Sequence, residues 1–325
     1  MQKQLDCVYC PSLMHLAEGT LPLTHALGWC ALATPVLLYS VRHERKQQET
    51  DSQSSLLMAG ATCLLIAVTL LPVPVPVVGA TTHMCMTPVF ALLVGARRII
   101  WPTFFVLLLQ ALFFAHGGIT TLGVNTLSLG LVGPLVASAL WLLARSCRVP
   151  RDIAVGFACG LGGLSVYLVD ACVLALGLSS STPPTATLVA VIIGFAPVQI
   201  PLALVEGLLS AFLVRTLEQR RPELLPSGLL KKSSKERSRS VVVSNTIVLL
   251  CLLLLNGCTY EGIDGTVFGA IAGSSGHPPE ESLIDLSQGE VGLAMTIIVL
   301  FTLGFVAGRV WERLMRSENV HSRES

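Results

Sequence analysis

The chain has 325 residues, of which 52% are hydrophobic and only 13% are charged, and its formal net charge is +1. Soluble domains carry about 25% charged residues, so this composition excludes an ordinary soluble protein. The small net charge provides no electrostatic footprint for nucleic acid.

The first twenty residues are polar enough to lie outside a membrane. They contain no apolar core of the length found in secretory signals. Cys7 and Cys10 have the spacing of zinc ligands, but no second pair completes such a site.

Apolar segments then follow in series, as in a polytopic membrane protein. We place nine spans at about 22–41, 56–74, 77–95, 99–115, 127–144, 153–178, 187–214, 240–257 and 291–308. The prolines of 71–79 and Pro88 interrupt the second and third spans. Irregular backbone at membrane depth is tolerated where it lines a cavity or is buried in protein.

The basic residues predict the orientation of these spans. Of the 21 Lys and Arg residues, all but Lys3 lie on alternate loops, after the first, third, fifth, seventh and ninth spans. The positive-inside rule places those loops in the cytoplasm. We therefore expect a multi-pass protein of the plasma (inner) membrane, with its N-terminus outside and its C-terminus inside.

The sequence lacks the residue motifs of several enzyme classes. The sequence contains no Walker A loop for ATP hydrolysis and no His-Glu-x-x-His motif. Asp170 and Glu206 are acids within apolar segments, and neither has a partner that would assign it a role. A Cys-His enzyme built on His83 and Cys85 would need an orienting third group that the sequence does not identify.

Three histidines lie near the predicted external side: His15, His83 and His116. Imidazole suits nickel, copper, iron and zinc, and the sulfur atoms of Met84, Cys85 and Met86 are further, softer donors. The alternative interpretation is that His83 is a hydrogen-bonded interior residue and that the sulfur atoms only pack.

Met14 and His15 would form a chelating unit if the chain began at Met14. The terminal amine, the next peptide nitrogen and the imidazole of residue two can then point at one metal ion in a plane. A fourth ligand completes the square-planar geometry that Ni(II) and Cu(II) prefer. A peptide bond before Met14 would block this unit.

Three blocks resemble one known family in the same order along the chain. The blocks are MHLAEGTLP (14–22), AHGGITTLGVNTLSLGLVGP (115–134) and PVQIPLALVEGLLSAFLVRTLEQRRPELL (197–225). They are similar to the CbiM/NikM family, the substrate-capture (S) components of cobalt and nickel energy-coupling-factor (ECF) transporters. The resemblance implies an all-α polytopic membrane protein with a seven-helix S-component bundle, entered by the N-terminus from outside.

The resemblance also implies a metal site. Its ligands would be Met14 through its amine, His15 and His83, with Met84, Cys85 and Met86 as additional soft donors. A supporting layer would contain His116, Thr120, Thr121 and Asn125. The family usually has a His-Pro-Thr-Gly-like turn where this chain has sulfur residues after His83.

The chain divides into four predicted parts. Residues 1–13 form an extension that we expect to be absent from the mature protein, and 14–225 form the capture domain. Residues 226–239 form a basic linker, and 240–325 form a two-span accessory unit, resembling the small CbiN/NikN subunit, with an acidic external loop at 259–290.

The expected function is uptake of Co²⁺ or Ni²⁺ as substrate. ATP hydrolysis would come from separate ATPase (A) subunits, coupled through a transmembrane (T) component, so the chain itself would not be an enzyme and would carry no prosthetic group. The alternative is a membrane metal sensor or receptor without transport. The sequence leaves cobalt against nickel undecided.

Overall fold

The computed structural model describes residues 15–48, 52–70, 73–75, 80–114, 116–230, 261–262 and 265–280, with single residues and short runs between 283 and 309. The elements in chain order are α1 (Leu23–Gln48), α2 (Ser52–Leu70), β1 (Val73–Val75), β2 (Ala80–Thr82), α3 (Thr87–Val94), α4 (Ala96–Phe113), α5 (Leu122–Asn125), the π-helix η1 (Thr126–Val132), α6 (Gly133–Ser146), α7 (Arg151–Gly177), α8 (Pro184–Arg220), the 3₁₀-helix η2 (Pro222–Leu224), β3 (Glu261–Gly262), the π-helix η3 (Gly265–Gly269) and α10 (Ala270–Ser274).

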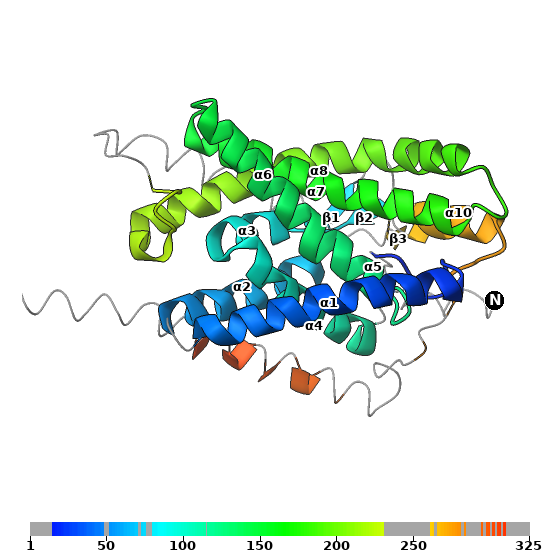
Figure 1. Ribbon diagram of the computed structural model, residues 1–325, viewed down its shortest axis with the longest axis horizontal. Coiled ribbons are helices and arrows are strands. Elements are labelled where there is room, and N and C mark those ends of the chain that lie inside the picture. The colour runs from blue at the N-terminus through cyan, green and yellow to red at the C-terminus, as the bar shows by residue number, and fades with distance from the viewer. Residues whose placement is uncertain are drawn as a thin grey trace, which may run out of the picture.

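The long helices confirm the all-α polytopic membrane fold. Five described helical segments are long and apolar enough to cross a membrane: Leu23–Gln47, Ala96–Phe113, Leu122–Ser146, Arg151–Gly177 and Pro184–Arg220. They correspond to the first, fourth, fifth, sixth and seventh predicted spans. The second span is α2, whose apolar part, Leu57–Leu70, is shorter. The helices run along the long axis of the molecule (Figure 1).

The prediction of a single span over 77–95 is wrong. The chain instead forms the antiparallel pair β1–β2, then an irregular segment from His83 to Met86, then the short α3. Proline lacks an N–H group and does not fit a helix interior, so the proline-rich run 71–79 favours extended backbone. Helix α3 has only eight residues and all of them are buried, which puts irregular backbone inside the protein and not against lipid.

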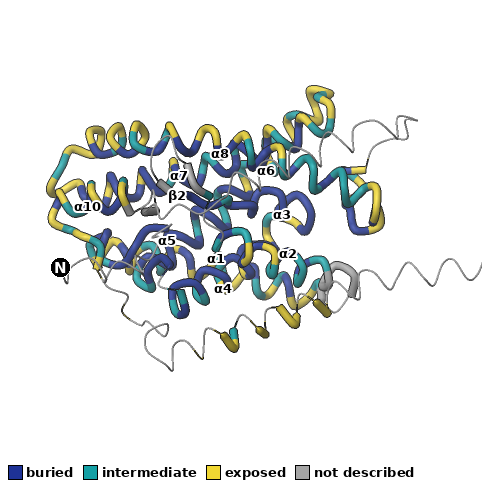
Figure 2. Tube along the Cα trace, turned by 180° about the vertical axis from the view of Figure 1, so that it is seen from behind, coloured by how far each residue is buried: buried dark blue, intermediate teal, exposed yellow. Residues whose placement is uncertain are grey.

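The outer surface of the long helices is apolar. Leu142, Leu143, Ile193, Leu204 and Leu208 are each more than half exposed. Figure 2 shows the inner faces of the helices buried, while exposed residues alternate along the outer faces of α6, α7 and α8. Apolar surface this extensive is unusual on a soluble monomer and fits contact with lipid.

Helices α7 and α8 pack closely along their length (Figure 1). A Cβ atom added at Gly207 would lie 2.5 Å from the carbonyl oxygen of Gly156, and one added at Gly160 would lie 2.7 Å from that of Ala203. Small residues four apart on both helices therefore allow their backbones to touch. Membrane helices commonly associate in this way, because lipid provides no hydrophobic driving force between them.

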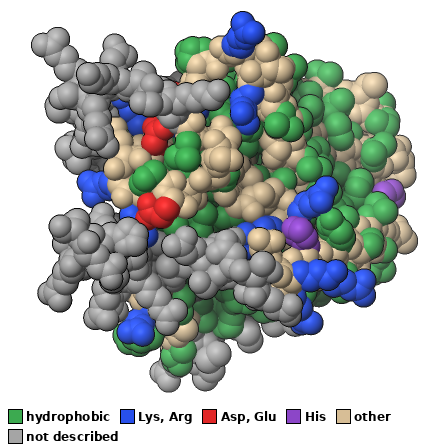
Figure 3. All heavy atoms as spheres, turned by 60° about the vertical axis from the view of Figure 1, so that its left-hand side comes forward, with side chains coloured by type: hydrophobic (Ala, Val, Ile, Leu, Met, Phe, Trp, Pro, Cys, Tyr) green, Lys and Arg blue, Asp and Glu red, His purple; other side chains and the backbone are tan. Residues whose placement is uncertain are grey.

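Arginines gather at one end of the bundle, where α1, α6 and α8 end and α4 and α7 begin (Figure 3). Arg98 of α4 makes a buried bidentate ion pair with Glu44 of α1, at 2.6 and 2.9 Å. Arg151 of α7 pairs with Glu218 of α8 at 2.7 Å and donates to the carbonyl oxygen of Leu229 at 3.1 Å. This end is therefore joined by one buried ion pair, between α1 and α4, and one half-buried ion pair, between α7 and α8.

Part of the predicted acidic loop 259–290 packs against the bundle at the other end. β3 pairs in parallel with β2, and Phe268 of η3 contacts Phe195 of α8, with ring centroids 4.5 Å apart. The eighth predicted span, 240–257, lies outside the described residues. Of the ninth, 291–308, the described residues are helical.

Candidate metal centre

Three histidines meet at the end of the bundle opposite the arginines. His15 precedes α1, His83 follows β2, and His116 lies in the loop between α4 and α5. Each offers a ring nitrogen, and these three nitrogens all lie within 4.8 Å of one another. The residues are 9%, 1% and 6% exposed, respectively. Among the described residues this is the one such group of His, Cys, Asp or Glu side chains.

The His15 ring packs edge to face against the rings of both His83 and His116. The centroid of His15 lies 4.6 Å from that of His83 and 5.0 Å from that of His116, with interplanar angles of 70° and 89°. Converging neutral imidazoles are typical ligands for divalent first-row transition metals. The geometry therefore suits capture of one such ion.

Burial keeps one of these imidazoles neutral. Removal from water lowers the pKa of His15 well below its ordinary value, and the neighbouring His83 and His116 lower it further. The Gln110 side chain raises the pKa of His15, although no hydrogen bond of ordinary geometry joins it to Nε2 of His15. A metal ligand must be unprotonated, so this environment favours binding at neutral pH.

Glu18 fastens the segment that carries His15 to the loop that carries His116. Its buried carboxylate accepts hydrogen bonds from the N–H groups of Ile119 and Thr120, at 2.8 and 3.3 Å, and from the hydroxyl of Thr120. These bonds join positions about one hundred residues apart in sequence. Local sequence does not indicate this role of Glu18, because its partners lie in a distant loop.

Thr121 and Asn125 hold the residue next to His15. The Thr121 hydroxyl and the Asn125 side-chain amide both donate to the carbonyl oxygen of Leu16, at 2.5 and 3.2 Å. Gly118 permits this approach, because a Cβ there would lie 2.7 Å from the backbone nitrogen of Glu18. The predicted supporting residues Thr120, Thr121 and Asn125 therefore lie around the histidine cluster.

His116 was predicted in the supporting layer, and the structure brings one of its ring nitrogens within 4.8 Å of those of His15 and His83. Its backbone N–H donates to the carbonyl oxygen of Gln110 in α4, at 3.1 Å. The Gln110 side chain in turn donates to Thr69 of α2, at 2.7 Å. Gln110 is a buried polar residue that sequence reasoning missed, although a glutamine inside an apolar span is itself a signal.

The sulfur residues after His83 pack in the core. Cys85 is buried in the apolar cluster that contains Leu16, while Met86 and the half-buried Met84 belong to the cluster around α3. Cys85 is not part of the group formed by the three histidines. Met14, the other predicted ligand, lies outside the described residues.

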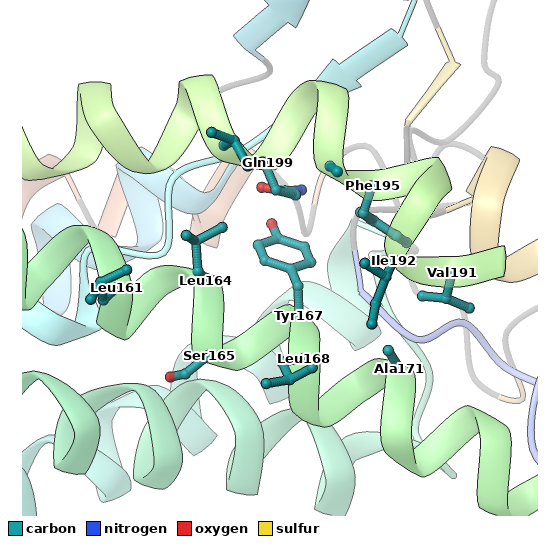
Figure 4. Close-up of a pocket in the computed structure, with 12 residues that line it drawn as sticks. Leu161, Leu164, Ser165, Tyr167, Leu168, Ala171, Val191, Ile192, Phe195 and Gln199 are labelled. Carbon is teal, nitrogen blue, oxygen red and sulfur yellow. The ribbon is translucent and has the colours of Figure 1, made fainter. Parts of the chain in front are cut away.

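A separate groove of about 360 Å³ lies between α7 and α8. Figure 4 shows Tyr167 of α7 extending toward Gln199 of α8, among aliphatic side chains. The residues that line the groove include no His, Cys, Asp or Glu. It therefore lacks the strong donors of a transition-metal site, and the histidine cluster is the better candidate.

Part of the C-terminal region packs against the segment that carries His15. The N–H group of Glu280 donates to the carbonyl oxygen of Glu18, at 2.9 Å. Pro278 and Glu280 also lie against Gly19, whose φ of +78° is in the left-handed region that favours glycine. The predicted acidic loop is thus, in this part, a packed neighbour of the N-terminal segment.

Known proteins similar to this chain are membrane transport components. The family model described as the cobalt uptake substrate-specific transmembrane region, CbiM, matches residues 15–224. The cobalt transport protein CbiM of Geobacter sulfurreducens is 32% identical, over 95% of this chain and 92% of that protein. The cobalt transport protein CbiM of Sorangium cellulosum is 37% identical, over 65% of this chain and 94% of that protein.

Solved structures have the same fold. The crystal structure of a truncated transition metal transporter superposes with a TM-score of 0.55, at 20% identity, over 63% of this chain and 99% of that one. The match to the family model covers most of the chain, and the Geobacter relative aligns over nearly its whole length. The chain therefore belongs to the CbiM family of cobalt uptake transmembrane components.

Proposed function

We propose that this protein is the substrate-capture component of an ATP-driven transporter that takes up Co²⁺ or Ni²⁺. The observation that carries the proposal is the buried cluster of His15, His83 and His116, whose ring nitrogens lie within 4.8 Å of one another. Membership of the CbiM family supports cobalt as a substrate. Divalent nickel has similar ligand preferences, so the donor set accommodates either ion.

The ion enters from outside and leaves toward the cytoplasm in this proposal. The histidines lie at the end of the bundle opposite Arg98, Arg145 and Arg151, and the positive-inside rule assigns the arginine end to the cytoplasm. The N-terminus is then external and the C-terminus internal. A cysteine-accessibility experiment on intact cells tests this orientation: a single cysteine introduced at Glu280 reacts with an impermeant maleimide, and one introduced at Arg220 does not.

His15 and His83 supply two imidazole ligands, and His116 lies close enough to supply a third. If the mature chain begins at Met14, its amine and the backbone nitrogen of His15 complete a planar chelate of the kind that Ni(II) favours. N-terminal sequencing of the mature protein tests this part. A mature chain that retains Met1 would exclude the amine, and the imidazoles would be the remaining nitrogen ligands.

The decisive binding experiment is isothermal titration of the purified protein with Co²⁺ and Ni²⁺. We expect His15→Ala and His83→Ala each to abolish tight binding. His277→Ala is the matched control, because His277 lies in the loop after α10 and outside the cluster. Unchanged affinity in His83→Ala would refute the site.

Transport requires partner subunits. The sequence contains no Walker A loop, so we assign ATP hydrolysis to A subunits and its coupling to a T component. Uptake of radioactive cobalt into cells, with active or inactivated ATPase subunits, tests this assignment. Accumulation that is independent of the ATPase would contradict it, and binding without any accumulation would favour a sensor.

A further inference from the structure

The turn that follows His83 is held by a carboxylate from another helix. Glu206 of α8 is 2% exposed, and its Oε1 accepts a hydrogen bond from the N–H of Met86, at 2.6 Å. The backbone N–H of Cys85 also donates to this carboxylate. Met86 has a φ of 50°, in the left-handed region that non-glycine residues rarely adopt. Two successive N–H groups in such a turn form a concave site for an acceptor, and here the Glu206 carboxyl group supplies the acceptor.

A carbonyl group of the same turn contacts the His83 imidazole. The Nδ1 atom of His83 lies 3.3 Å from the carbonyl oxygen of Met84. This contact is a hydrogen bond when Nδ1 carries the proton, and that tautomer leaves the lone pair on Nε2 for a metal ion. Metal-binding histidines commonly donate their second ring N–H to a carbonyl or carboxylate group.

The two contacts share one peptide group. The carbonyl of Met84 and the N–H of Cys85 belong to the same planar unit and, in a trans peptide, point in opposite directions. Glu206 therefore holds one side of this peptide while His83 contacts the other. A carboxylate bound to the N–H group also makes the carbonyl oxygen a better acceptor, because hydrogen bonds in a chain polarise one another.

We propose that Glu206 is a positioning residue for the metal site: through the Met84–Cys85 peptide it orients His83 and selects the tautomer whose Nε2 faces the ion. The inference rests on the proposed function, because it assigns the substrate ion to His83. It gives a role to an acid that the sequence leaves unexplained. It also connects α8 to a ligand that precedes it by more than one hundred residues.

Helix α7 leaves space for this carboxylate at one glycine. A Cβ atom at Gly163 would lie 2.7 Å from Oε2 of Glu206 and 3.3 Å from its Cδ. An alanine at this position would therefore displace the carboxylate from the turn without removing it. Gly163→Ala and Glu206→Gln thus perturb the same contact by different means, and the proposal predicts similar effects of both on the metal site.

The test uses the full chain in detergent and the metal ions alone as probes. In Glu206→Gln a neutral amide with one acceptor oxygen replaces the carboxyl group, so the hydrogen bonds that this side chain accepts from the turn are weakened. We expect Co²⁺ affinity to fall about 10- to 100-fold, the range found when supporting partners of metal ligands are removed. We also expect the d–d absorption spectrum of bound Co²⁺ to change, because the direction of one ligand changes.

Glu218→Gln is the matched control. It makes the same chemical change on the same helix, at a carboxylate that pairs with Arg151 and not with the turn. We expect it to keep the affinity and the Co²⁺ spectrum of the unmodified protein. Glu206→Asp shortens the side chain but retains the carboxylate, and partial recovery of the spectrum in this variant supports positioning by charge.

A readout without metal separates the two proposals. Cys85 lies in the turn and is 1% exposed. In the metal-free protein we therefore expect Cys85 to be alkylated faster in Glu206→Gln than in the unmodified protein. Mass spectrometry measures the alkylation, with Cys63 of α2 as the internal reference. Loss of binding in His83→Ala together with unchanged affinity, spectrum and alkylation in Glu206→Gln would overturn the positioning role alone. Retained binding in His83→Ala would instead overturn the metal site.

Discussion

Removing the Glu18 carboxylate is expected to weaken metal binding by loosening two loops at once. Glu18 accepts from the N–H groups of Ile119 and Thr120 and from the Thr120 hydroxyl, and these bonds join the segment of His15 to the loop of His116. Glu18→Ala leaves the N–H groups of Ile119 and Thr120 without this acceptor. Neither histidine is altered, so the effect on the metal acts only through their relative positions.

The magnitude follows from the number of bonds. A hydrogen bond to a charged group contributes about 1.5–3 kcal/mol, and the bond from Thr120 N–H is long. Counting two effective bonds at the lower value gives about 3 kcal/mol for the order of the two loops. If binding must restore that order, the affinity falls by about 100-fold, since about 1.4 kcal/mol corresponds to a factor of ten.

The assay is isothermal titration of purified Glu18→Ala with Co²⁺, beside Glu280→Gln as control. Glu280 is an exposed acid next to the same segment, and its hydrogen bond to Glu18 is made by its backbone N–H. The control therefore changes local charge without removing a bond to the loop. An affinity in Glu18→Ala equal to that of the control would refute the idea that Glu18 orders the site.

Three further predictions concern the bundle and its response to pH. Gly207→Val should lower the thermal unfolding midpoint, because its Cβ atom would lie 2.5 Å from the Gly156 carbonyl oxygen and overpacking costs about 1–3 kcal/mol. Gly28→Ala is the control and should leave the midpoint unchanged, because a Cβ atom there meets open space. Equal midpoints in the two variants would contradict close packing of α7 and α8. Arg98→Met should destabilise the protein by about 3–5 kcal/mol, because it removes the bidentate ion-pair partner of the buried Glu44. The double variant Arg98→Met with Glu44→Leu should recover much of this loss in the same unfolding assay. A single variant as stable as the unmodified protein would contradict a stabilising buried pair. For pH, the folded protein holds the pKa of His15 well below its unfolded value of about 6.5, so the unfolded chain binds the extra proton and the stability of the metal-free protein should decline as pH falls below about 6.5. His15→Gln should reduce this decline in midpoints measured from about pH 7.5 to 5.5, and an identical pH dependence in both proteins would exclude His15 as its source.

The membrane class and most of the long helices follow from sequence alone. An apolar run of about 20 residues has few alternatives to a membrane helix, because lipid offers no partners to exposed backbone groups. The same argument failed for 77–95, where Thr81, Thr82 and His83 interrupt the apolar residues and the chain forms a strand, an irregular turn and a short buried helix. His15 and His83 were predicted as ligands from the resemblance to the CbiM/NikM family, since residue type alone left an interior hydrogen-bonding role for His83 open.

Only the tertiary structure shows what holds those ligands. His116 joins His15 and His83 because its loop folds over the N-terminal segment, and the bonds from Glu18 that fix this arrangement span about one hundred residues. Glu206 meets the turn after His83 across 120 residues, through backbone N–H groups that every residue but proline possesses. Residue type identifies a donor or an acceptor, but the choice of a backbone partner depends on how the helices pack, and no local pattern in the sequence encodes it.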